Sequence, residues 1–305
     1  MKILVTGGAG FIASHVADAC IAVGHDVVVV DNLSMGKREN VNPKAKFFQM
    51  DIRDKAICKI FNDERFDAVI HHAAQMDVRK SVEDPQFDAS VNIIGTINLL
   101  ECCKATGVQK FLFASTGGAI YGEQEYFPAD EAHPVRPVSP YGISKLAIEK
   151  YLFYYNIEFK VQYIALRYAN VYGPRQNPHG EAGVVAIFTK KMLAGDQPII
   201  NGDGKQTRDY VYVDDVVRAN IFALTHDQSD VFNVGTGIET DVNQLFRSLN
   251  TLTGSRCKEL HGAAKKGEQQ RSVLECSRIQ KTFGWKPTVS LEEGLKRTVE
   301  FFRKR

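Results

Sequence analysis

The sequence has no long hydrophobic run and no excess of charge of either sign. No stretch of about 18 apolar residues occurs, so we expect no membrane-spanning helix and no membrane partner. Lysine and arginine number 38 against 36 aspartates and glutamates, which leaves a formal charge of +2. This balance argues against nucleic acid or an anionic lipid surface as the binding partner.

The cysteines form no recognisable metal-binding or disulfide framework. All six lack C-x-x-C spacing and lie in apolar or helical contexts; they are Cys20, Cys58, Cys102, Cys103, Cys257 and Cys276. We therefore expect free thiols in a reducing cytoplasm. The first segment, MKILVTGG, is strand-like and lacks the apolar core and cleavage site of a signal peptide, which also favours the cytoplasm.

The first half of the chain alternates short apolar runs with amphipathic segments. The runs are nearly continuous and rich in β-branched residues; they cover 2–6, 26–30, 46–50, 67–72, 110–116 and 161–168. Strands of this kind are buried on both faces of a parallel sheet, and right-handed crossovers place helices such as 13–24 and 90–107 on both faces. The predicted fold class is α/β, a doubly wound parallel sheet of the Rossmann type.

The alternation ends after about residue 170 in a turn-rich, polar segment, after which short helices and strands mix. We predict a dinucleotide-binding domain over 1–170, to which the chain returns around 208–235. A smaller mixed α/β lobe over 171–207 and 236–305 would bind the substrate.

A glycine-rich turn follows the first apolar run. In VTGGAGFIASH, Gly8-x-Gly10-x-x-Ala13 matches the dinucleotide-binding fingerprint, and Gly7-x-x-Gly10-x-x-Ala13 matches its wider variant. Such glycines let the backbone approach a pyrophosphate, which the N-terminus of the following helix stabilises. A dinucleotide cofactor is therefore expected at this turn.

Asp31, at the end of the second run, indicates which dinucleotide is bound. Its carboxylate can accept hydrogen bonds from both ribose hydroxyls and would repel a 2′-phosphate, so NAD is favoured, although Arg38 could serve NADP. Asp51 and Ile52, which end the third strand, are expected beside the adenine.

The segment SPYGISK predicts a helix that presents a phenol and an ammonium on one face. Ser139 is suited to the N-cap and Pro140 to the first helical position. Tyr141 and Lys145 are then separated by one turn. A free phenol titrates near ~10, but an ammonium and the positive charge of oxidised nicotinamide favour the phenolate. The pair is therefore expected to act as a proton acceptor.

Two hydroxyl side chains, Ser115 and Thr116, end the fifth run, where open α/β sheets place their ligands. Adjacent residues of a strand point to opposite faces, so only one of them can reach the substrate. We assign this role to Thr116, with Ser115 as the alternative.

Seven ordered segments together resemble a known family. They are TGGAGFIA, VDNLSMG, HHAAQ, ASTGGAIYG, SPYGISK, RYANVYGPRQ and GDGKQTRDYVYVDDV. The set is similar to the extended short-chain dehydrogenase/reductases, and within them to the UDP-glucose (UDP-galactose) 4-epimerases. Ala13 departs from the commonest pattern, which has a third glycine.

The resemblance implies epimerisation of a UDP-sugar at C4 with tightly bound NAD. Tyr141 would be the base, Lys145 would lower its pKa, and Thr116 would bind the sugar's O4. The cofactor would contact Gly7, Gly10, Phe11, Ile12, Asp31, Asn32, Ser34, Gly36, Asp51, Ile52, Ala73, Ala74, Gln75, Asn92, Ser115, Tyr141, Lys145 and Tyr168. The substrate would contact Thr116, Val78, Ser81, Asn170, Val184, Val185, Arg208, Arg271 and Ser272, with Lys265 as a further candidate.

The resemblance also implies a substrate range and an assembly. Ser272 is small where a large residue would crowd the sugar's C2 substituent, so N-acetylhexosamines are possible substrates beside plain hexoses. A homodimer is expected through the helices 91–104 and 141–155. His71 and His72 have no cysteine or carboxylate set nearby, so a structural role and no metal are expected.

Other functions compete with this interpretation. Related dehydratases pair their threonine with an Asp-Glu, and decarboxylases also carry a carboxylate there, whereas Gly117 and Gly118 follow Thr116. A net dehydrogenase that releases NADH is not distinguished by these motifs. A non-catalytic NAD-sensing protein is the least favoured alternative, because both Tyr141 and Lys145 are present.

Overall fold

The computed structural model describes residues 1–178, 183–264 and 269–304. Its main sheet has seven strands in the order β10-β6-β5-β4-β1-β2-β3. Every pairing in it is parallel. The strands are β1 (Lys2–Thr6), β2 (Asp26–Asp31), β3 (Lys46–Gln49), β4 (Ala68–His71), β5 (Lys110–Thr116), β6 (Gln162–Tyr168) and β10 (Asp230–Val234). The predicted doubly wound parallel sheet is confirmed.

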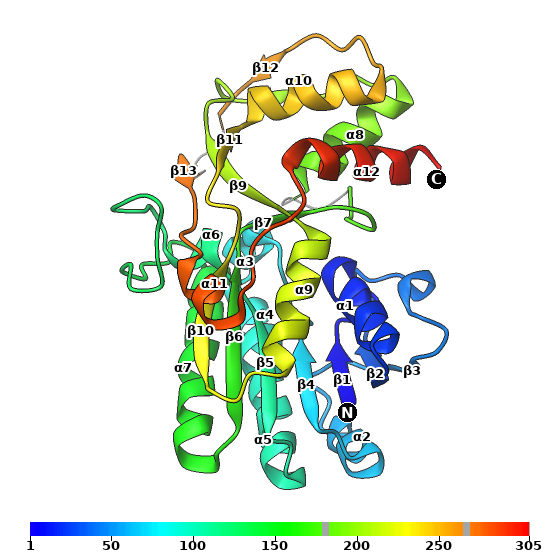
Figure 1. The fold of residues 1–305 in the computed structure, drawn as a ribbon, viewed down its shortest axis with the longest axis vertical. Helices are drawn as coiled ribbons and strands as arrows, with labels where there is room; N and C mark the ends of the chain where they lie inside the picture. The colour runs from blue at the N-terminus through cyan, green and yellow to red at the C-terminus, as the bar shows by residue number, and fades with distance from the viewer. Residues whose placement is uncertain (179–182, 265–268, 305) are drawn as a thin grey trace.

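Helices cover both faces of this sheet (Figure 1). On one face lie α1 (Phe11–Ala22) and α9 (Val213–Leu224), and on the other lie α2 (Ile57–Glu64), α5 (Gly95–Thr106) and α7 (Pro140–Phe159). Successive side chains of a strand point to opposite faces of the sheet, so the apolar side chains form two cores. Val5 packs in the core with α1 and α9, and Leu4 packs in the core with α2, α5 and α7.

Shorter helices connect these elements near the ends of the strands. They are η1 (Arg38–Asn40), α3 (Val78–Glu83), α4 (Pro85–Ala89), the π-helical turn η2 (Ser90–Ile94), α6 (Gly117–Ile120) and α11 (Ser277–Phe283). The single helix expected over 90–107 is thus η2 followed by α5. A π-helical turn of this kind is often found at functional sites.

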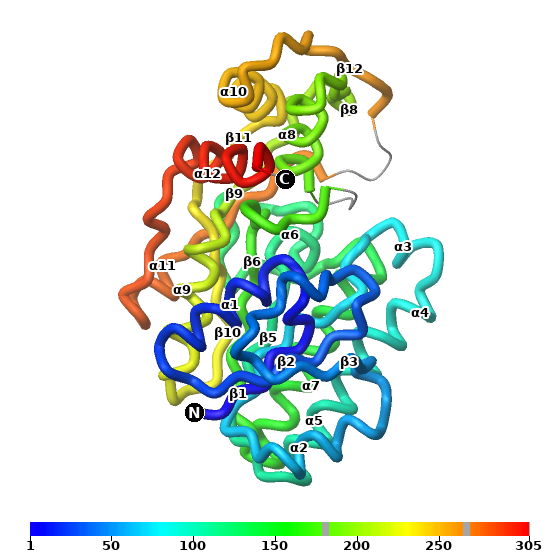
Figure 2. Tube along the Cα trace, turned by 90° about the vertical axis from the view of Figure 1, so that its right-hand side faces the viewer, coloured from blue at the N-terminus to red at the C-terminus, as the bar shows by residue number. Residues whose placement is uncertain are grey.

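The second lobe lies beyond one end of the main sheet (Figure 2). Its larger sheet contains β7 (Asn170–Tyr172), β9 (Thr207–Tyr212), β11 (Glu239–Asp241) and β13 (Arg271–Ser272), and its smaller one pairs β8 (Ile200–Asn201) with β12 (His261–Gly262). Its helices are α8 (Val184–Ala194), α10 (Val242–Thr253) and α12 (Leu291–Arg303). Because β9 pairs with β7, β11 and β13, the chain returns to the main sheet at α9 and not already at residue 208.

A disulfide joins Cys58 of α2 to Cys102 of α5, with Cα atoms 5.2 Å apart. The expectation of free thiols is therefore wrong for these two residues. Both helices pack on the same face of the main sheet, and this proximity between residues 44 positions apart has no signature in the spacing of the cysteines. The other four cysteines are free.

None of the helices within the described ranges combines the length and apolarity needed to cross a membrane.

Candidate active site

The glycine turn forms a tight cradle between β1 and α1. Gly7 has φ +72°, and a Cβ there would lie 2.7 Å from the backbone nitrogen of Ala73. A Cβ on Gly36 would similarly lie 2.8 Å from Ala9. Gly10 is the N-cap of α1 and offers no capping side chain, so the N–H groups of the first turn can face an anion. Phe11 and Ile12 form that turn. The backbone here fits a dinucleotide pyrophosphate.

Asp31 lies beside this turn and is 8% exposed. Its carboxylate accepts hydrogen bonds from the backbone nitrogens of Ala9 (3.0 Å) and Leu33 (2.7 Å). These bonds hold the carboxylate at the end of β2, and each oxygen keeps acceptor capacity for a ribose hydroxyl. Burial raises its pKa.

The predicted adenine wall is assembled by side-chain hydrogen bonds. The Asn32 amide donates to Asp51 at 3.0 Å and accepts from the Ser34 backbone at the same distance. Arg53 donates to both Asp51 oxygens at 2.9 Å and holds the pKa of that carboxyl well below its usual range. Arg53 was not anticipated from the sequence, although its position two residues after Asp51 suits this turn.

A buried carboxylate ties together three segments around the end of β4. Asp88 accepts from the side chains of Gln75 and Asn92 at 3.0 Å each and from the Ser144 hydroxyl at 2.6 Å. Asn92 also exchanges two hydrogen bonds with the backbone of Gln75. The segment that contains Ala73 and Ala74 is thereby joined to α7. Asp88 lay in no recognised motif, so sequence reasoning missed it.

Helix α7 begins as predicted. Ser139 caps it by accepting from the Gly142 backbone, and Pro140 is the first helical residue. The Lys145 side chain is 3% exposed, and its ammonium donates to the Ala114 carbonyl at 2.8 Å. Burial lowers the pKa of Lys145 to about 8, against the raising effect of the Asp88 and Glu149 carboxylates.

The surroundings of Tyr141 within the protein act against its phenolate form. Burial and the nearby Asp88 carboxylate raise the pKa of its phenol. The Lys145 nitrogen lies 5.7 Å from the centre of the Tyr141 ring and is held by a backbone carbonyl. Within the protein alone the pKa of the phenol is therefore not lowered, and its lowering by Lys145 together with an oxidised nicotinamide stays a prediction. The phenolate needs a further positive charge, such as that of an oxidised nicotinamide.

Ser115 and Thr116 lie on opposite sides of β5, as strand alternation requires. The Ser115 hydroxyl is buried and donates to Glu149 at 2.6 Å. The Thr116 hydroxyl is part-buried and accepts from the Ala119 backbone at 3.2 Å, capping α6. Since the Ser115 hydroxyl donates its proton to Glu149, Thr116 is the better placed of the two to donate to a substrate.

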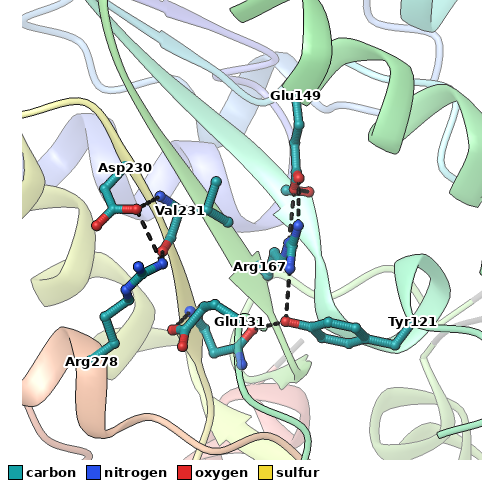
Figure 3. A network of polar contacts seen from close by, with 9 residues as sticks. Tyr121, Glu131, Glu149, Arg167, Asp230, Val231 and Arg278 are labelled. Carbon is teal, nitrogen blue, oxygen red and sulfur yellow. Dashed lines mark hydrogen bonds and ion pairs between the residues drawn. The ribbon is translucent and has the colours of Figure 1, made fainter. Parts of the chain in front are cut away.

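Beneath these residues lies a buried ionic network (Figure 3). Arg167 of β6 donates to the two carboxylate oxygens of Glu149 at 3.0 and 2.7 Å, and to the Tyr121 hydroxyl at 2.9 Å. Glu149 follows Lys145 by one helical turn, so Tyr141, Lys145 and Glu149 form one stripe along α7. That spacing was the signal by which the sequence could have revealed Glu149.

The histidine pair and Tyr168 fill the space behind the glycine turn. His71 bonds Thr6 and Thr96 at 2.7 and 2.8 Å, which confirms its structural role. Burial lowers the pKa of His72 to about 3, and its ring bonds the Tyr168 hydroxyl at 3.2 Å. Among the described residues, no group of three or more histidines, cysteines or carboxylates could hold a metal ion.

The substrate candidates of the second lobe converge on the residues after Thr116. A Cβ on Gly118 would lie 3.9 Å from the Ser272 hydroxyl and 4.0 Å from the side-chain oxygen of Asn170. Arg208 stands opposite Ser272 in the pairing of β9 with β13. These three predicted residues are therefore brought to one place.

Arg271 is engaged with other side chains. Glu239 accepts from two of its nitrogens at 2.9 Å, and the ring of Phe127 lies 3.8 Å from its guanidinium carbon. Neither Glu239 nor Phe127 was anticipated, because they come from segments without a recognised motif.

The remaining substrate-binding candidates lie in α3 and at the start of α8. Val78 is exposed at the start of α3, and the buried Ser81 hydroxyl donates to the Val78 carbonyl at 2.6 Å. Val184 and Val185 begin α8, and Val185 is buried in the core of the second lobe, so its side chain serves packing. Lys265 lies outside the described residues.

A parallel sheet with a glycine turn after β1, an acidic residue at the end of β2 and a Tyr-x-x-x-Lys helix facing β5 defines the short-chain dehydrogenase/reductase class. The model of the NAD-dependent epimerase/dehydratase family matches residues 3–235. The chain belongs to this family.

Individual relatives extend the likeness over the whole chain. A UDP-glucose 4-epimerase from Thermotoga maritima, solved with UDP-glucose, is 53% identical with a TM-score of 0.98 and covers 100% of this chain and 99% of its own. One from Thermus thermophilus, in complex with NAD, is 45% identical with a TM-score of 0.95 and covers 99% of both chains. The UDP-glucose 4-epimerase of Mycolicibacterium smegmatis is 43% identical over 309 residues, 99% of each chain.

Proposed function

We propose that this protein is an isomerase that interconverts UDP-glucose and UDP-galactose by reversible oxidation at C4 of the hexose. The observation that carries the proposal is the arrangement of Tyr141, buried Lys145 and Thr116 at the end of β5, next to a turn shaped for a dinucleotide. The family membership and the 43–53% identical relatives support the same activity.

Tyr141 takes the proton of the sugar's 4-hydroxyl and gives it back after the 4-keto sugar has turned over. NAD held by the glycine turn and Asp31 would supply the reversible oxidation and reduction at C4 of the hexose. Lys145 keeps a positive charge beside the phenol and, through Ala114, fixes the distance between α7 and β5. Thr116 orients O4 by a hydrogen bond.

Retention of the cofactor follows from the residues that would hold it. Asp31 would bind the adenosine ribose, the turn at Gly7 and Gly10 the pyrophosphate, and Asn32 and Asp51 the adenine. Several of these groups are already fixed by hydrogen bonds within the protein, so little ordering cost is left for binding. Tight retention suits a reaction with no net redox change.

The residues that follow Thr116 disfavour lyase activity. The dehydratases that the chain resembles pair their threonine with an Asp-Glu, and the decarboxylases carry a carboxylate near this position, whereas Gly117 and Gly118 follow Thr116 here. Neither residue can supply or remove a proton.

The substrate range and the assembly are finer proposals. Arg208, Arg271 and Asn170 would anchor the diphosphate, and Ser272 would leave room for an N-acetyl group at C2. Apolar side chains exposed along α7 support a homodimer through the helices 91–104 and 141–155; they are Ile143, Tyr151, Phe153, Tyr154 and Ile157. A cytoplasmic location stays a prediction. Light scattering of Phe153→Asp against the unchanged protein tests the dimer.

The decisive test is incubation of the purified protein with UDP-glucose without added NAD. We expect UDP-galactose to form without accumulation of NADH. Tyr141→Phe should lower turnover by about 100-fold or more, because the proton acceptor is lost, whereas Tyr151→Phe, exposed on the same helix, should leave it unchanged. Steady release of NADH would indicate a net dehydrogenase, and unchanged turnover of Tyr141→Phe would refute the mechanism.

A further inference from the structure

One buried carboxylate lies between the segment after β4 and the start of α7. Asp88 of α4 is fully buried, with an exposed fraction of 0%. One of its oxygens accepts from the side-chain amides of Gln75 and Asn92 at 3.0 Å each, and the other accepts from the Ser144 hydroxyl at 2.6 Å. Ser144 directly precedes Lys145 on α7. The carboxylate therefore connects two segments that carry candidate site residues.

Backbone groups determine which ends of the two amides face Asp88. The side-chain oxygen of Gln75 accepts from the Asp77 backbone at 2.8 Å, and that of Asn92 accepts from the Gln75 backbone at the same distance. With their oxygens engaged in this way, both amides present N–H groups to Asp88. An ionised carboxyl has only acceptor oxygens, so it suits a set of three donors. Hydrogen bonds to a charged acceptor are strong and fix the positions of their donors.

The same chain of contacts reaches the glycine turn. A Cβ on Gly7 would lie 2.7 Å from the Ala73 backbone nitrogen, so the turn and the segment after β4 lie against each other. The glutamine of this segment donates to Asp88. Because Ser144 is three residues after Tyr141, its bond to Asp88 holds the first turns of α7. The turn shaped for a dinucleotide and the phenol are thus positioned through one carboxylate.

Two buried carboxylates act on Lys145, and they differ in their own partners. Burial lowers the pKa of Lys145, and the carboxylates of Asp88 and Glu149 act against this change. Glu149 forms a bidentate pair with Arg167, whereas the donors that the described residues offer Asp88 are all neutral. Asp88 is therefore left as the counter-charge of the Lys145 ammonium.

The charge of Asp88 also acts on the phenol. Burial raises the pKa of Tyr141, and the Asp88 carboxylate adds to this rise. The phenol therefore keeps its proton until a positive charge, such as that of an oxidised nicotinamide, lies beside it. Because Asp88 and Lys145 cancel each other, a phenolate and this positive charge cancel as well. The buried site then carries no net charge, which avoids the cost of an uncompensated ion.

We propose that Asp88 is a positioning residue for the epimerase reaction: its carboxylate fixes α7 against the segment after β4, and its charge is the counter-charge of Lys145 beside the phenol. This inference rests on the proposed function and extends it to a residue outside the recognised motifs. Asp88 acts through Ser144 and Lys145 and not on the substrate itself. Its consequence is that Tyr141 accepts a proton only when the cofactor is in place.

The other ionisable groups around Asp88 are neutral, paired or exposed. Helix α4 packs against α3, η2 and α7, and η2 has no ionisable side chain. Behind α7, burial lowers the pKa of His71 well below its usual range and that of His72 to about 3, so both rings are neutral. The charged side chains of α3, of the cap of α4 and of the turn after β3 are exposed, where salt screens them; they are Arg79, Lys80, Glu83, Asp84 and Arg53. A change in the titration of Tyr141 on loss of the Asp88 charge is therefore assignable to this carboxylate.

The first test is Asp88→Asn, which keeps the shape of the side chain and removes its charge. In the NAD-loaded protein, the ultraviolet absorbance of the phenolate is titrated as the difference from Tyr141→Phe. We expect the phenolate to appear at lower pH in Asp88→Asn than in the unchanged protein, because the carboxylate raises the pKa of Tyr141. The pH profile of kcat should move in the same direction, since the carboxylate also raises the pKa of Lys145.

Asp215→Asn is the matched control. Asp215 of α9 is also fully buried and accepts from the backbone and the hydroxyl of Thr288 at 3.0 and 2.9 Å, on the other face of the main sheet. Its substitution should lower the thermal midpoint and leave the titration of the phenol where it is. The comparison separates the charge of Asp88 from a general loss of stability.

Ser144→Ala tests the positioning role without a change of charge. It removes one hydrogen bond to Asp88, so α7 is held less firmly. We expect kcat to fall about three- to tenfold with KM for UDP-glucose and the pH profile unchanged. Should Asp88→Asn fail to fold, the split between kcat and KM in Ser144→Ala decides for or against the proposal.

Three results would overturn the inference. A phenolate that appears at the same pH in Asp88→Asn would remove the role as counter-charge, and an unchanged kcat in Ser144→Ala would remove the positioning role. An equal displacement of the titration in Asp215→Asn would show that destabilisation alone moves it. If the unchanged protein epimerises no UDP-hexose, the proposed function fails by itself, because the phenolate titration needs no substrate.

Discussion

Two arginine–glutamate pairs in this molecule share a geometry and differ in burial. Arg167 and Glu149 pair in the core of the main domain, with side chains 7% and 4% exposed. Arg271 and Glu239 pair in the second lobe, with side chains 48% and 28% exposed. Each glutamate accepts from two nitrogens of its arginine, at 2.7 to 3.0 Å.

The difference in burial determines what each pair can do. Loss of one partner of a buried pair leaves a charge that neither water nor protein compensates, so such a pair is a fixed part of the structure. An exposed pair contributes little to stability, and its guanidinium can exchange one anion for another. The pair beneath α7 is therefore a fixed part of the structure, whereas the exposed pair in the second lobe could exchange its glutamate for the diphosphate that we propose Arg271 binds.

The largest effect is expected from Glu149→Gln. The variant leaves the Arg167 charge buried without its counter-charge, and the free energy of unfolding should fall by about 3–5 kcal/mol. Guanidinium unfolding at equilibrium measures it. Ser115→Ala removes only the hydrogen bond to Glu149 and should cost about 1 kcal/mol. Equal losses of unfolding free energy in Glu149→Gln and Ser115→Ala would show that the uncompensated charge of Arg167 does not cause the destabilisation.

Arg271→Ala should show the opposite behaviour. It would remove the bidentate contact that we propose for the substrate diphosphate, so KM for UDP-glucose should rise about 10- to 100-fold, while the unfolding midpoint stays unchanged. Arg247→Ala, which breaks another exposed pair of this lobe with Glu259, is the control and should alter neither quantity. A large loss of stability in Arg271→Ala would erase the distinction between the two pairs.

The pH dependence of turnover links the buried pair to Lys145. Because the pKa of Lys145 is lowered to about 8, its ammonium is present below that pH, and kcat should decline as the pH rises through it. Glu149 raises this pKa, so Glu149→Gln should move the descending limb to lower pH. Burying the charged lysine costs free energy, and this cost is fully present below about pH 8. It is relieved as the pH rises from about 8 toward 10.5, so the free energy of unfolding should increase over the range in which kcat declines.

Groups facing Lys145 from other elements bear on the same measurement. Asp88 also raises its pKa, while burial and, after it, the charge of Lys145 lower the pKa of His71 and His72. If the descending limb of the pH profile stays at the same pH in Glu149→Gln, a group other than Lys145 produces it.

The smallest effect is expected from Glu239→Gln. Its carboxylate occupies the edge of Arg271 that a diphosphate would take, and it would also repel that anion. The variant should therefore lower KM about two- to fivefold, with the gain shrinking at high salt. Glu259→Gln is the matched control and should leave KM unchanged. A higher KM in Glu239→Gln would mean that Glu239 positions Arg271 and does not compete for it.

Local patterns were sufficient for most of the main domain. Continuous apolar runs predicted its strands, and Ser139 with Pro140 predicted the start of α7, because these signals depend on neighbours within one turn or one strand. The second lobe was predicted only in outline, since β13 and β11 are two or three residues long and acquire meaning only by pairing with β9.

The sequence by itself determined the parallel sheet, the glycine turn with Asp31, and the one-turn spacing of Tyr141 and Lys145, because backbone geometry imposes each of these locally. Only the tertiary structure decided that Ser115 faces Glu149, that Cys58 meets Cys102, that Asp88 joins Gln75, Asn92 and Ser144, and that Gly118 faces Ser272. These contacts join segments far apart in the chain, and burial and charge at each depend on what the fold places opposite.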